Sequence, residues 1–189
     1  MRATQEAMMR VREVVRAGDW VVDGTLGNGH DALLLAELVG ESGKVVAFDV
    51  QEAALLASGE RLRAAGLVER VEMHLRSHEE LGEIVREELG AAMFNLGYLP
   101  GSDQLVITQP EKTLRALETA FRLLRPGGLL SVVCYPGHEG GRAEAEAVLA
   151  WAGGVPAEAC EARWGLETEL SHRPFFVGLW KRKAREEMR

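Results

Sequence analysis

The stretch of sequence that decides the fold is Trp20-Val21-Val22-Asp23-Gly24-Thr25-Leu26-Gly27-Asn28-Gly29-His30-Asp31. It begins with a short apolar run that ends on an acid, a pattern typical of a buried strand. The glycines that follow allow the tight turn that leads from a strand into a helix. The next residues, 32–39, are almost wholly apolar, which indicates a helix packed against a sheet. A strand, a glycine-rich loop and a helix are therefore predicted in succession.

The same alternation continues on both sides of this stretch. A helix is predicted over residues 4–17, before it. Beyond it, the pattern predicts strands at 44–48, 70–75, 91–95 and 129–134, and helices at 52–65, 79–89, 110–124 and 141–151. Gly90 is expected to end the helix at 79–89, and residues 125–128 to form a turn. Regular alternation of this kind predicts a parallel sheet with helices on both faces.

The end of the chain departs from this rhythm. Two strands are predicted at 159–164 and 175–180, without room between them for a helix of the earlier lengths. This pair indicates an antiparallel element added at one edge of the sheet. Residues 1–189 as a whole are expected to form one α/β domain, because a chain of 189 residues leaves little for a second.

Composition narrows the class of protein. The chain is 47% hydrophobic and 27% charged, and it lacks an apolar run long enough to cross a membrane. Its charged N-terminus does not resemble a secretion signal. The two cysteines, Cys134 and Cys160, match no metal spacing and lie in strand-like runs. We therefore expect a cytoplasmic protein with both cysteines reduced and in the core, and no membrane partner.

The balance of charge bears on nucleic-acid binding. A formal net charge of −7 argues against broad, non-specific attachment to phosphates, although a local basic face is compatible with it. The densest basic cluster, at residues 181–185, is diluted at once by Glu186 and Glu187. A solvated terminal surface is the simpler interpretation of that cluster.

Ligands of such sheets bind beyond the carboxyl ends of the strands. The segment from Gly27 to Ala32 fits the dinucleotide spacing G-x-G-x-x-A, so glycine spacing alone leaves a dinucleotide open. Asp23 and Asp31 would repel a pyrophosphate, whereas they would attract a cationic amino acid ligand. We therefore favour the cationic ligand over a dinucleotide and over a turn without any ligand.

Polar residues also follow the second and third predicted strands. Asp49 could accept hydrogen bonds from both ribose hydroxyls of an adenosine, and Gln51 could reach the same region. A helix cap is the alternative role for Asp49. Ser77 and His78 could contact the adenine, but Ser77 could equally cap a helix, with Glu80 completing a capping box.

The segment after the fourth strand is Asn95-Leu96-Gly97-Tyr98-Leu99-Pro100-Gly101. Transfer of a methyl group to nitrogen needs a neutral amine whose lone pair is aimed at the methyl carbon. A side-chain amide and neighbouring main-chain carbonyls can accept the hydrogens of the amine and fix that aim. Asn95 can supply the amide, and Tyr98 can stack on a base. The alternative is a tight loop with a packed tyrosine.

The loop after the fifth strand contains Tyr135 and His138. His138 could take a proton from an incoming ammonium, because histidine titrates near neutrality. Both residues could equally hold a target base by stacking, and a structural or solvated histidine is also open.

Four segments in this order resemble the Putative rRNA methylase family. They are residues 22–31, 48–51, 94–103 and 135–141, so the resemblance spans nearly the whole chain. It implies a Rossmann-like class I methyltransferase with seven mostly parallel strands, the last one antiparallel. Members of the family act as tRNA 5-(aminomethyl)-2-thiouridine methyltransferases. The resemblance thus implies S-adenosylmethionine as cofactor, the wobble uridine of a tRNA anticodon stem-loop as substrate, and a homodimer.

The resemblance also bears on individual positions. Residues 95–98 are similar in position to the Asn-Pro-Pro-Tyr motif of amino-group methyltransferases, without its prolines, and Gly24 stands where alanine is expected. The residues expected at the reaction are Asn95, Tyr98 and His138. Those expected to bind the cofactor are Asp23, Gly27, Asn28, Gly29, His30, Asp31, Asp49, Gln51, Ser77, His78 and Asn95. A methyltransferase acting on another RNA position or a small molecule, an NAD-dependent oxidoreductase and a non-catalytic nucleotide-binding module are the alternatives.

Overall fold

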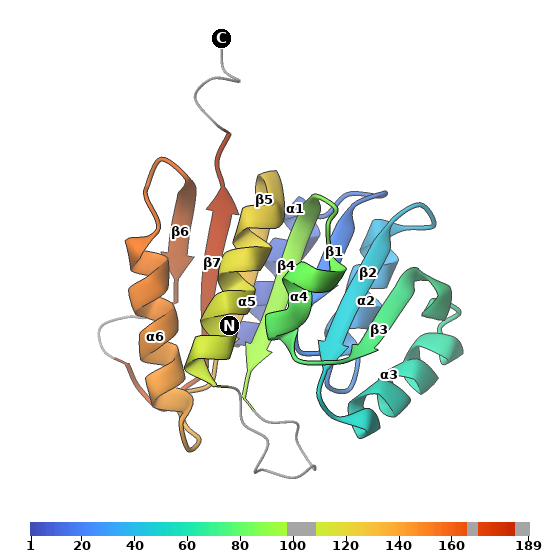
Figure 1. Cartoon of the computed structure of the whole chain (residues 1–189), viewed down its shortest axis with the longest axis horizontal. Helices are drawn as coiled ribbons and strands as arrows, with labels where there is room; N and C mark the ends of the chain where they lie inside the picture. The colour runs from blue at the N-terminus through green and yellow to red at the C-terminus, as the bar shows by residue number, and fades with distance from the viewer. Residues whose placement is uncertain (98–108, 166–169, 184–189) are drawn as a thin grey trace.

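The computed structural model describes residues 1–97, 109–165 and 170–183, which include one seven-stranded sheet (Figure 1). The strand order is β3-β2-β1-β4-β5-β7-β6. The strands are β1 (Trp20–Asp23), β2 (Lys44–Asp49), β3 (Val71–Leu75), β4 (Leu89–Leu96), β5 (Leu124–Cys134), β6 (Cys160–Trp164) and β7 (Phe175–Lys181). Strands β1 to β5 are parallel, whereas β7 runs antiparallel to both β5 and β6. The predicted seven-stranded sheet with an antiparallel last strand is confirmed.

Helices cover both faces of the sheet (Figure 1). On one face lie α1 (Ala3–Val14), α2 (His30–Val39) and α3 (Glu52–Ala64), whose buried apolar residues share one core cluster. On the other face lie α4 (Leu81–Ile84), α5 (Pro110–Leu123) and α6 (Gly141–Gly154). The described residues also include two short 3-10 turns, η1 (Val68–Arg70) and η2 (His78–Glu80).

The two cores explain why the central strands are apolar along most of their length. Val21 belongs to the core under α1 and α2, whereas the next residue, Val22, belongs to the core under α4 to α6. Val45 and Val46 divide in the same way in β2. Successive side chains of a strand point to opposite faces, so a strand covered on both sides must be apolar at every position.

The prediction of a helix over residues 79–89 is wrong. The chain makes only η2 and the single turn α4 there, and β4 already begins at Leu89. Gly90, which was expected to end a helix, lies inside β4. A Cβ atom at this position would lie 2.1 Å from the Asp19 carboxylate. Glycine is therefore required because the Asp19 side chain lies close to the backbone of β4 at this position. In the sequence, such a glycine cannot be distinguished from one that ends a helix.

Residues 125–128, expected as a turn, lie within β5 instead. Leu89 pairs with Leu124 but Ala91 pairs with Leu129, so these residues form an irregularity in the pairing of β4 with β5. The Arg125 side chain donates hydrogen bonds to Asp19 Oδ2 at 2.8 Å and to the carbonyl of Val14 at 2.9 Å. This contact is made where α1 ends, at Val14 rather than at 17.

The remaining elements lie close to their predicted ranges. Cys134 and Cys160 are buried and unpaired, which confirms them as core residues. Within the described residues, no helix combines the length and the apolar character that a membrane crossing requires.

Candidate active site

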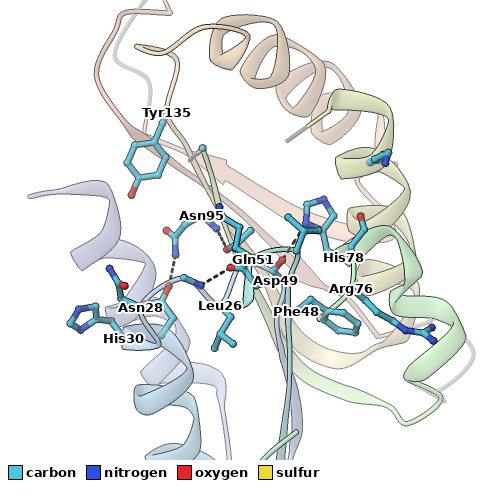
Figure 2. Close-up of a pocket in the computed structure, with 18 of the residues that line it drawn as sticks. Leu26, Asn28, His30, Phe48, Asp49, Gln51, Arg76, His78, Asn95 and Tyr135 are labelled. Carbon is cyan, nitrogen blue, oxygen red and sulfur yellow. Dashed lines mark hydrogen bonds between the residues drawn. The ribbon is translucent and has the colours of Figure 1, made fainter. Parts of the chain in front are cut away.

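A cavity of about 800 Å³ opens beyond the carboxyl ends of β1, β2, β4 and β5 (Figure 2). Its volume lies in the range of ligand-binding pockets. The predicted residues that line it are Gly27, Asn28, His30, Asp31, Asp49, Gln51, Ser77, His78, Asn95 and His138. Asp23 and Gly29 are buried behind this lining, and Tyr98 lies outside the described residues. The structure therefore brings most of the candidate residues to one cavity.

The glycine-rich loop is held against α3. Gly27 and Gly29 have φ angles of 49° and 73°, a region that glycine adopts readily. A Cβ atom at Gly29 would lie 2.7 Å from Ser58 Oγ. Ser58 Oγ donates a hydrogen bond to the carbonyl of Gly27 at 2.9 Å, and Arg61 Nε donates to that of Asn28 at 2.7 Å. Ser58 and Arg61 thus fix the loop from α3, and nothing in the local sequence identifies them.

Asp49 lies at the end of β2, half-buried at the wall of the cavity (Figure 2). Its Oδ2 accepts a hydrogen bond from the Gly27 N–H at 2.9 Å, and its Oδ1 accepts one from the Gln51 N–H at 3.0 Å. A carboxylate can accept about four hydrogen bonds in all. Asp49 therefore orients the loop and still has acceptor capacity for hydroxyl groups in the cavity.

Asp23 lies fully buried at the end of β1. Its Oδ1 accepts a hydrogen bond from the Thr25 N–H at 3.1 Å, while Oδ2 has no hydrogen-bond partner in the described part of the chain. Burial raises the pKa of Asp23, and the neighbouring carboxylates of Asp31 and Asp49 raise it further. Such a group is costly to ionise without a cation beside it. The free protein thus carries an unsatisfied acidic centre beneath the cavity.

His78 is held under the cavity rather than projecting across it. Its Nδ1 lies 3.2 Å from the carbonyl oxygen of Gly24, and its ring meets that of Phe94 edge to face at 5.8 Å. Burial lowers the pKa of His78, which favours the neutral ring. The preceding Ser77 accepts a hydrogen bond from the Glu79 N–H, so the capping role of Ser77 is observed.

Asn95 lies at the end of β4, in the middle of the cavity (Figure 2). Its backbone N–H donates a hydrogen bond to Thr25 Oγ1 at 2.7 Å. Its side-chain Nδ2 donates to Oδ2 of Asp31, a residue in the first turn of α2. Burial raises the pKa of Asp31, whereas the bond from Asn95 and the charge of His30 lower it.

The loop after β5 closes the same part of the cavity. A Cβ atom at Gly97 would lie 3.6 Å from His138 Nε2 and 3.7 Å from a ring carbon of Tyr135. His138 Nδ1 lies 2.8 Å from the carbonyl oxygen of Glu139. Because a carbonyl oxygen only accepts, Nδ1 carries the proton in the neutral ring, and Nε2 is then the basic atom. An aromatic ring and an imidazole thus face the strand end that carries Asn95.

Some lining residues could not be inferred from local sequence. Thr4 and Met8 reach the cavity from α1, Arg76 from the end of β3, and Lys112 from α5. Each lies in an ordinary segment of its own element, so only the tertiary fold reveals its position.

The chain is similar to known proteins in both sequence and fold. The family model described as Putative rRNA methylase matches residues 45–176. The tRNA (mnm(5)s(2)U34)-methyltransferase, chloroplastic, of Arabidopsis thaliana is 42% identical over 165 residues, which cover 82% of this chain. The chain spans only 60% of the length of that relative.

Two solved structures are similar over nearly their whole length. The putative rRNA-methylase from Clostridium thermocellum superposes with a TM-score of 0.91 at 35% identity, covering 96% of this chain and 98% of the other. The putative methyltransferase from Streptococcus mutans, solved in complex with SAH, has a TM-score of 0.86 at 32% identity and the same coverage of both chains.

Proposed function

The chain belongs to the Putative rRNA methylase family, and on that premise we propose that it methylates the aminomethyl nitrogen of 5-aminomethyl-2-thiouridine at the tRNA wobble position. The methyl donor is S-adenosylmethionine. The observation that carries this proposal is the placement of Asn95, which lines the same cavity as the glycine loop and Asp49. The 42% identity to a tRNA methyltransferase supports the choice of acceptor.

The residues of the cavity fit this cofactor. Asp49 has acceptor capacity for the two ribose hydroxyls, and the loop at Gly27 and Asn28 lies directly against it. The unsatisfied Oδ2 of Asp23 provides negative charge for a cationic ligand. A dinucleotide would place its pyrophosphate against this acid. When bound, S-adenosylmethionine supplies an electrophilic methyl group on a positively charged sulfur.

The acceptor amine is oriented by the end of β4. The Asn95 Oδ1 and the backbone carbonyls of Leu96 and Gly97 accept its hydrogens and aim its lone pair. Tyr135 and His138 hold the base from the loop after β5, and His138 Nε2 can take the proton that the amine releases. A stacking role for Tyr98 remains a prediction, since this residue lies outside the described part of the chain.

The substrate surface suits a single exposed nucleotide rather than a long duplex. Arg76 and Lys112 are cationic residues at the cavity, although the chain as a whole carries −7. An anticodon loop presents unpaired bases that can be turned out into such a pocket. The homodimer and the cytoplasmic location remain predictions.

The direct test is an assay with labelled S-adenosylmethionine and tRNA that carries 5-aminomethyl-2-thiouridine. Nucleoside mass spectrometry should show a gain of one methyl group on that nucleoside. If no methyl appears there while the cofactor still binds, the acceptor is another RNA position or a small molecule.

Replacing Asp49 with alanine is expected to weaken cofactor binding by about 1–3 kcal/mol, through the loss of hydrogen bonds to a charged acceptor. Titration calorimetry with S-adenosylhomocysteine measures this change. Asp49→Asn should fall between the alanine variant and the natural protein, because it keeps one acceptor oxygen but no charge. Unchanged affinity in Asp49→Ala would remove this residue from the site.

Replacing Asp23 with asparagine is expected to stabilise the free protein at neutral pH and to weaken cofactor binding. The folded pKa of Asp23 is raised by burial, so its favourable contribution is complete below the unfolded pKa and is lost as pH rises through the folded pKa. Asparagine does not ionise, so the variant does not lose stability in this way as pH rises. The gain in melting temperature should therefore be largest at neutral pH and shrink towards acid pH. Scans with and without S-adenosylhomocysteine test both effects, and a lower melting temperature at neutral pH would contradict the argument.

A further inference from the structure

We propose that Asp31 is a positioning residue, which holds the Asn95 carboxamide so that its oxygen rather than its NH₂ group faces the acceptor amine. This inference rests on the proposed methyl transfer to nitrogen. It gives Asp31 a role that differs from the cofactor contact expected from its place in the glycine-rich segment.

Packing around Asn95 does not determine which end of its side-chain amide faces the cavity. The hydrogen bond from its backbone to Thr25 Oγ1 fixes the end of β4 against the glycine loop. The two ends of the side-chain amide have nearly the same shape, so packing alone does not decide which one faces the cavity. The orientation of the amide is decided only by a neighbouring group that can accept but not donate hydrogen bonds, or the reverse.

Asp31 is that neighbouring group. Its side chain comes from α2 and accepts the hydrogen bond from Asn95 Nδ2, which Figure 2 marks by a dashed line from the Asn95 side chain. An ionised carboxylate only accepts hydrogen bonds, so the amide must turn its NH₂ group towards it. The Asn95 Oδ1 is consequently directed away from Asp31, and Asp31 itself is only 9% exposed.

The polarity matters because an amine nucleophile presents N–H groups to the site. An amide oxygen accepts a hydrogen bond from one of these N–H groups. An amide NH₂ would instead place a donor against a donor and leave the lone pair of the amine misdirected. The contact between Asp31 and Asn95 selects the productive arrangement before substrate arrives.

The same contact makes the arrangement sensitive to protonation. Asp31 faces Asp23 from β1 and Tyr135 from the loop after β5, and His30 adjoins it on α2. A protonated Asp31 can donate its O–H to Asn95 Oδ1 and so remove the selection. Turnover should therefore fall on the acid side as Asp31 gains a proton, and it should do so through Asn95.

The kinetic test uses Asp31→Asn and Asp31→Ala. An amide at position 31 can donate or accept, so Asp31→Asn loses the selection, and alanine loses the partner altogether. We expect kcat to fall roughly tenfold in the first and roughly 100-fold in the second, as for other misplaced catalytic groups. The affinity for S-adenosylhomocysteine should stay within about twofold, because the cofactor pocket keeps Asp49 and the loop. Asp31→Glu, which restores a carboxylate, should recover part of kcat.

Asp19→Asn is the matched control. Asp19 is also a largely buried, hydrogen-bonded carboxylate, but it pairs with Arg125 at the opposite end of β1 from the cavity. Its substitution should lower the melting temperature and leave kcat unchanged. A loss of kcat equal to that of the Asp31 variants would show general destabilisation instead of positioning.

A second readout does not depend on activity. The side-chain NH₂ resonances of Asn95, identified by their absence in Asn95→Ala, should shift with pH in the natural protein. In Asp31→Asn this titration should disappear. Resonances that titrate identically in both proteins would overturn the contact, and so would natural-like kcat in Asp31→Ala. A cofactor affinity that falls in step with kcat would reassign Asp31 to cofactor binding. If the natural protein itself leaves the aminomethyl nucleoside unmethylated, the proposed function fails, while the NMR result still decides the contact.

Discussion

Replacing Asn95 with alanine is expected to lower kcat about 100-fold and to leave affinity for S-adenosylhomocysteine within about twofold. The carboxamide lies at the end of β4, where Asp31 and Thr25 hold it. Its proposed task is to accept a hydrogen from the amine, so its removal leaves the lone pair without direction. The glycine loop and Asp49, which make the cofactor pocket, keep their own contacts.

The measurement compares single-turnover rates on modified tRNA with calorimetric affinity for S-adenosylhomocysteine. Asn95→Asp is a second variant at this position. Its carboxylate would face the Asp31 carboxylate, and this should raise the pH at which the enzyme becomes active. Asn95→Gln keeps the amide but moves it by one methylene, and should lose activity through misplacement. If affinity and turnover fall by equal factors in Asn95→Ala, Asn95 belongs to the cofactor pocket rather than to the acceptor site.

The central sheet could be predicted because its signals are local. In a strand such as β1 the residues before the final acid are all apolar, since both faces are covered, and the acid marks the carboxyl edge. Asp49 and Asn95 could be placed together for the same reason. Parallel strands end at a common edge, so polar residues that follow separate strands converge there without any knowledge of tertiary contacts.

The wrong predictions came from sequence patterns that two different structures can produce. Gly90 resembles a helix stop but is required by the Asp19 side chain, and residues 125–128 resemble a turn but form an irregularity of β5. In each case the deciding neighbour lies far away in sequence.

The partners of the site residues could not be predicted at all. Ser58 and Arg61 hold the glycine loop from α3, and Asp31 contacts Asn95 across 64 positions of the chain. These bonds depend on the distance at which α2 and α3 pack on the sheet. Sequence periodicity gives the facing side of a helix but not that distance.

Replacing Gly24 with alanine is expected to destabilise the protein by about 3 kcal/mol, because overpacking a filled core forces its neighbours out of place. The ring of Phe94 already occupies the space. A Cβ atom at position 24 would lie 2.1, 2.4 and 2.7 Å from three of its ring carbons. Phe94 is only 1% exposed and its ring also contacts that of His78 edge to face, so it has little room to withdraw. The carbonyl of Gly24 contacts His78, so cofactor affinity should fall as well.

A double-mutant cycle with Phe94→Leu tests this cause. Leucine leaves space beside position 24, so Gly24→Ala should cost less in that background, with a coupling energy of about 1–3 kcal/mol, as expected for residues in contact. Gly153→Ala is the control, since a Cβ there meets nothing within 4 Å and lies in α6. It should leave stability unchanged or raise it slightly. Additive effects of Gly24→Ala and Phe94→Leu in denaturant unfolding would show that the ring is not the obstacle. The cycle would also explain why glycine replaces the alanine expected from the family: the small residue at 24 and the large ring at 94 share one volume.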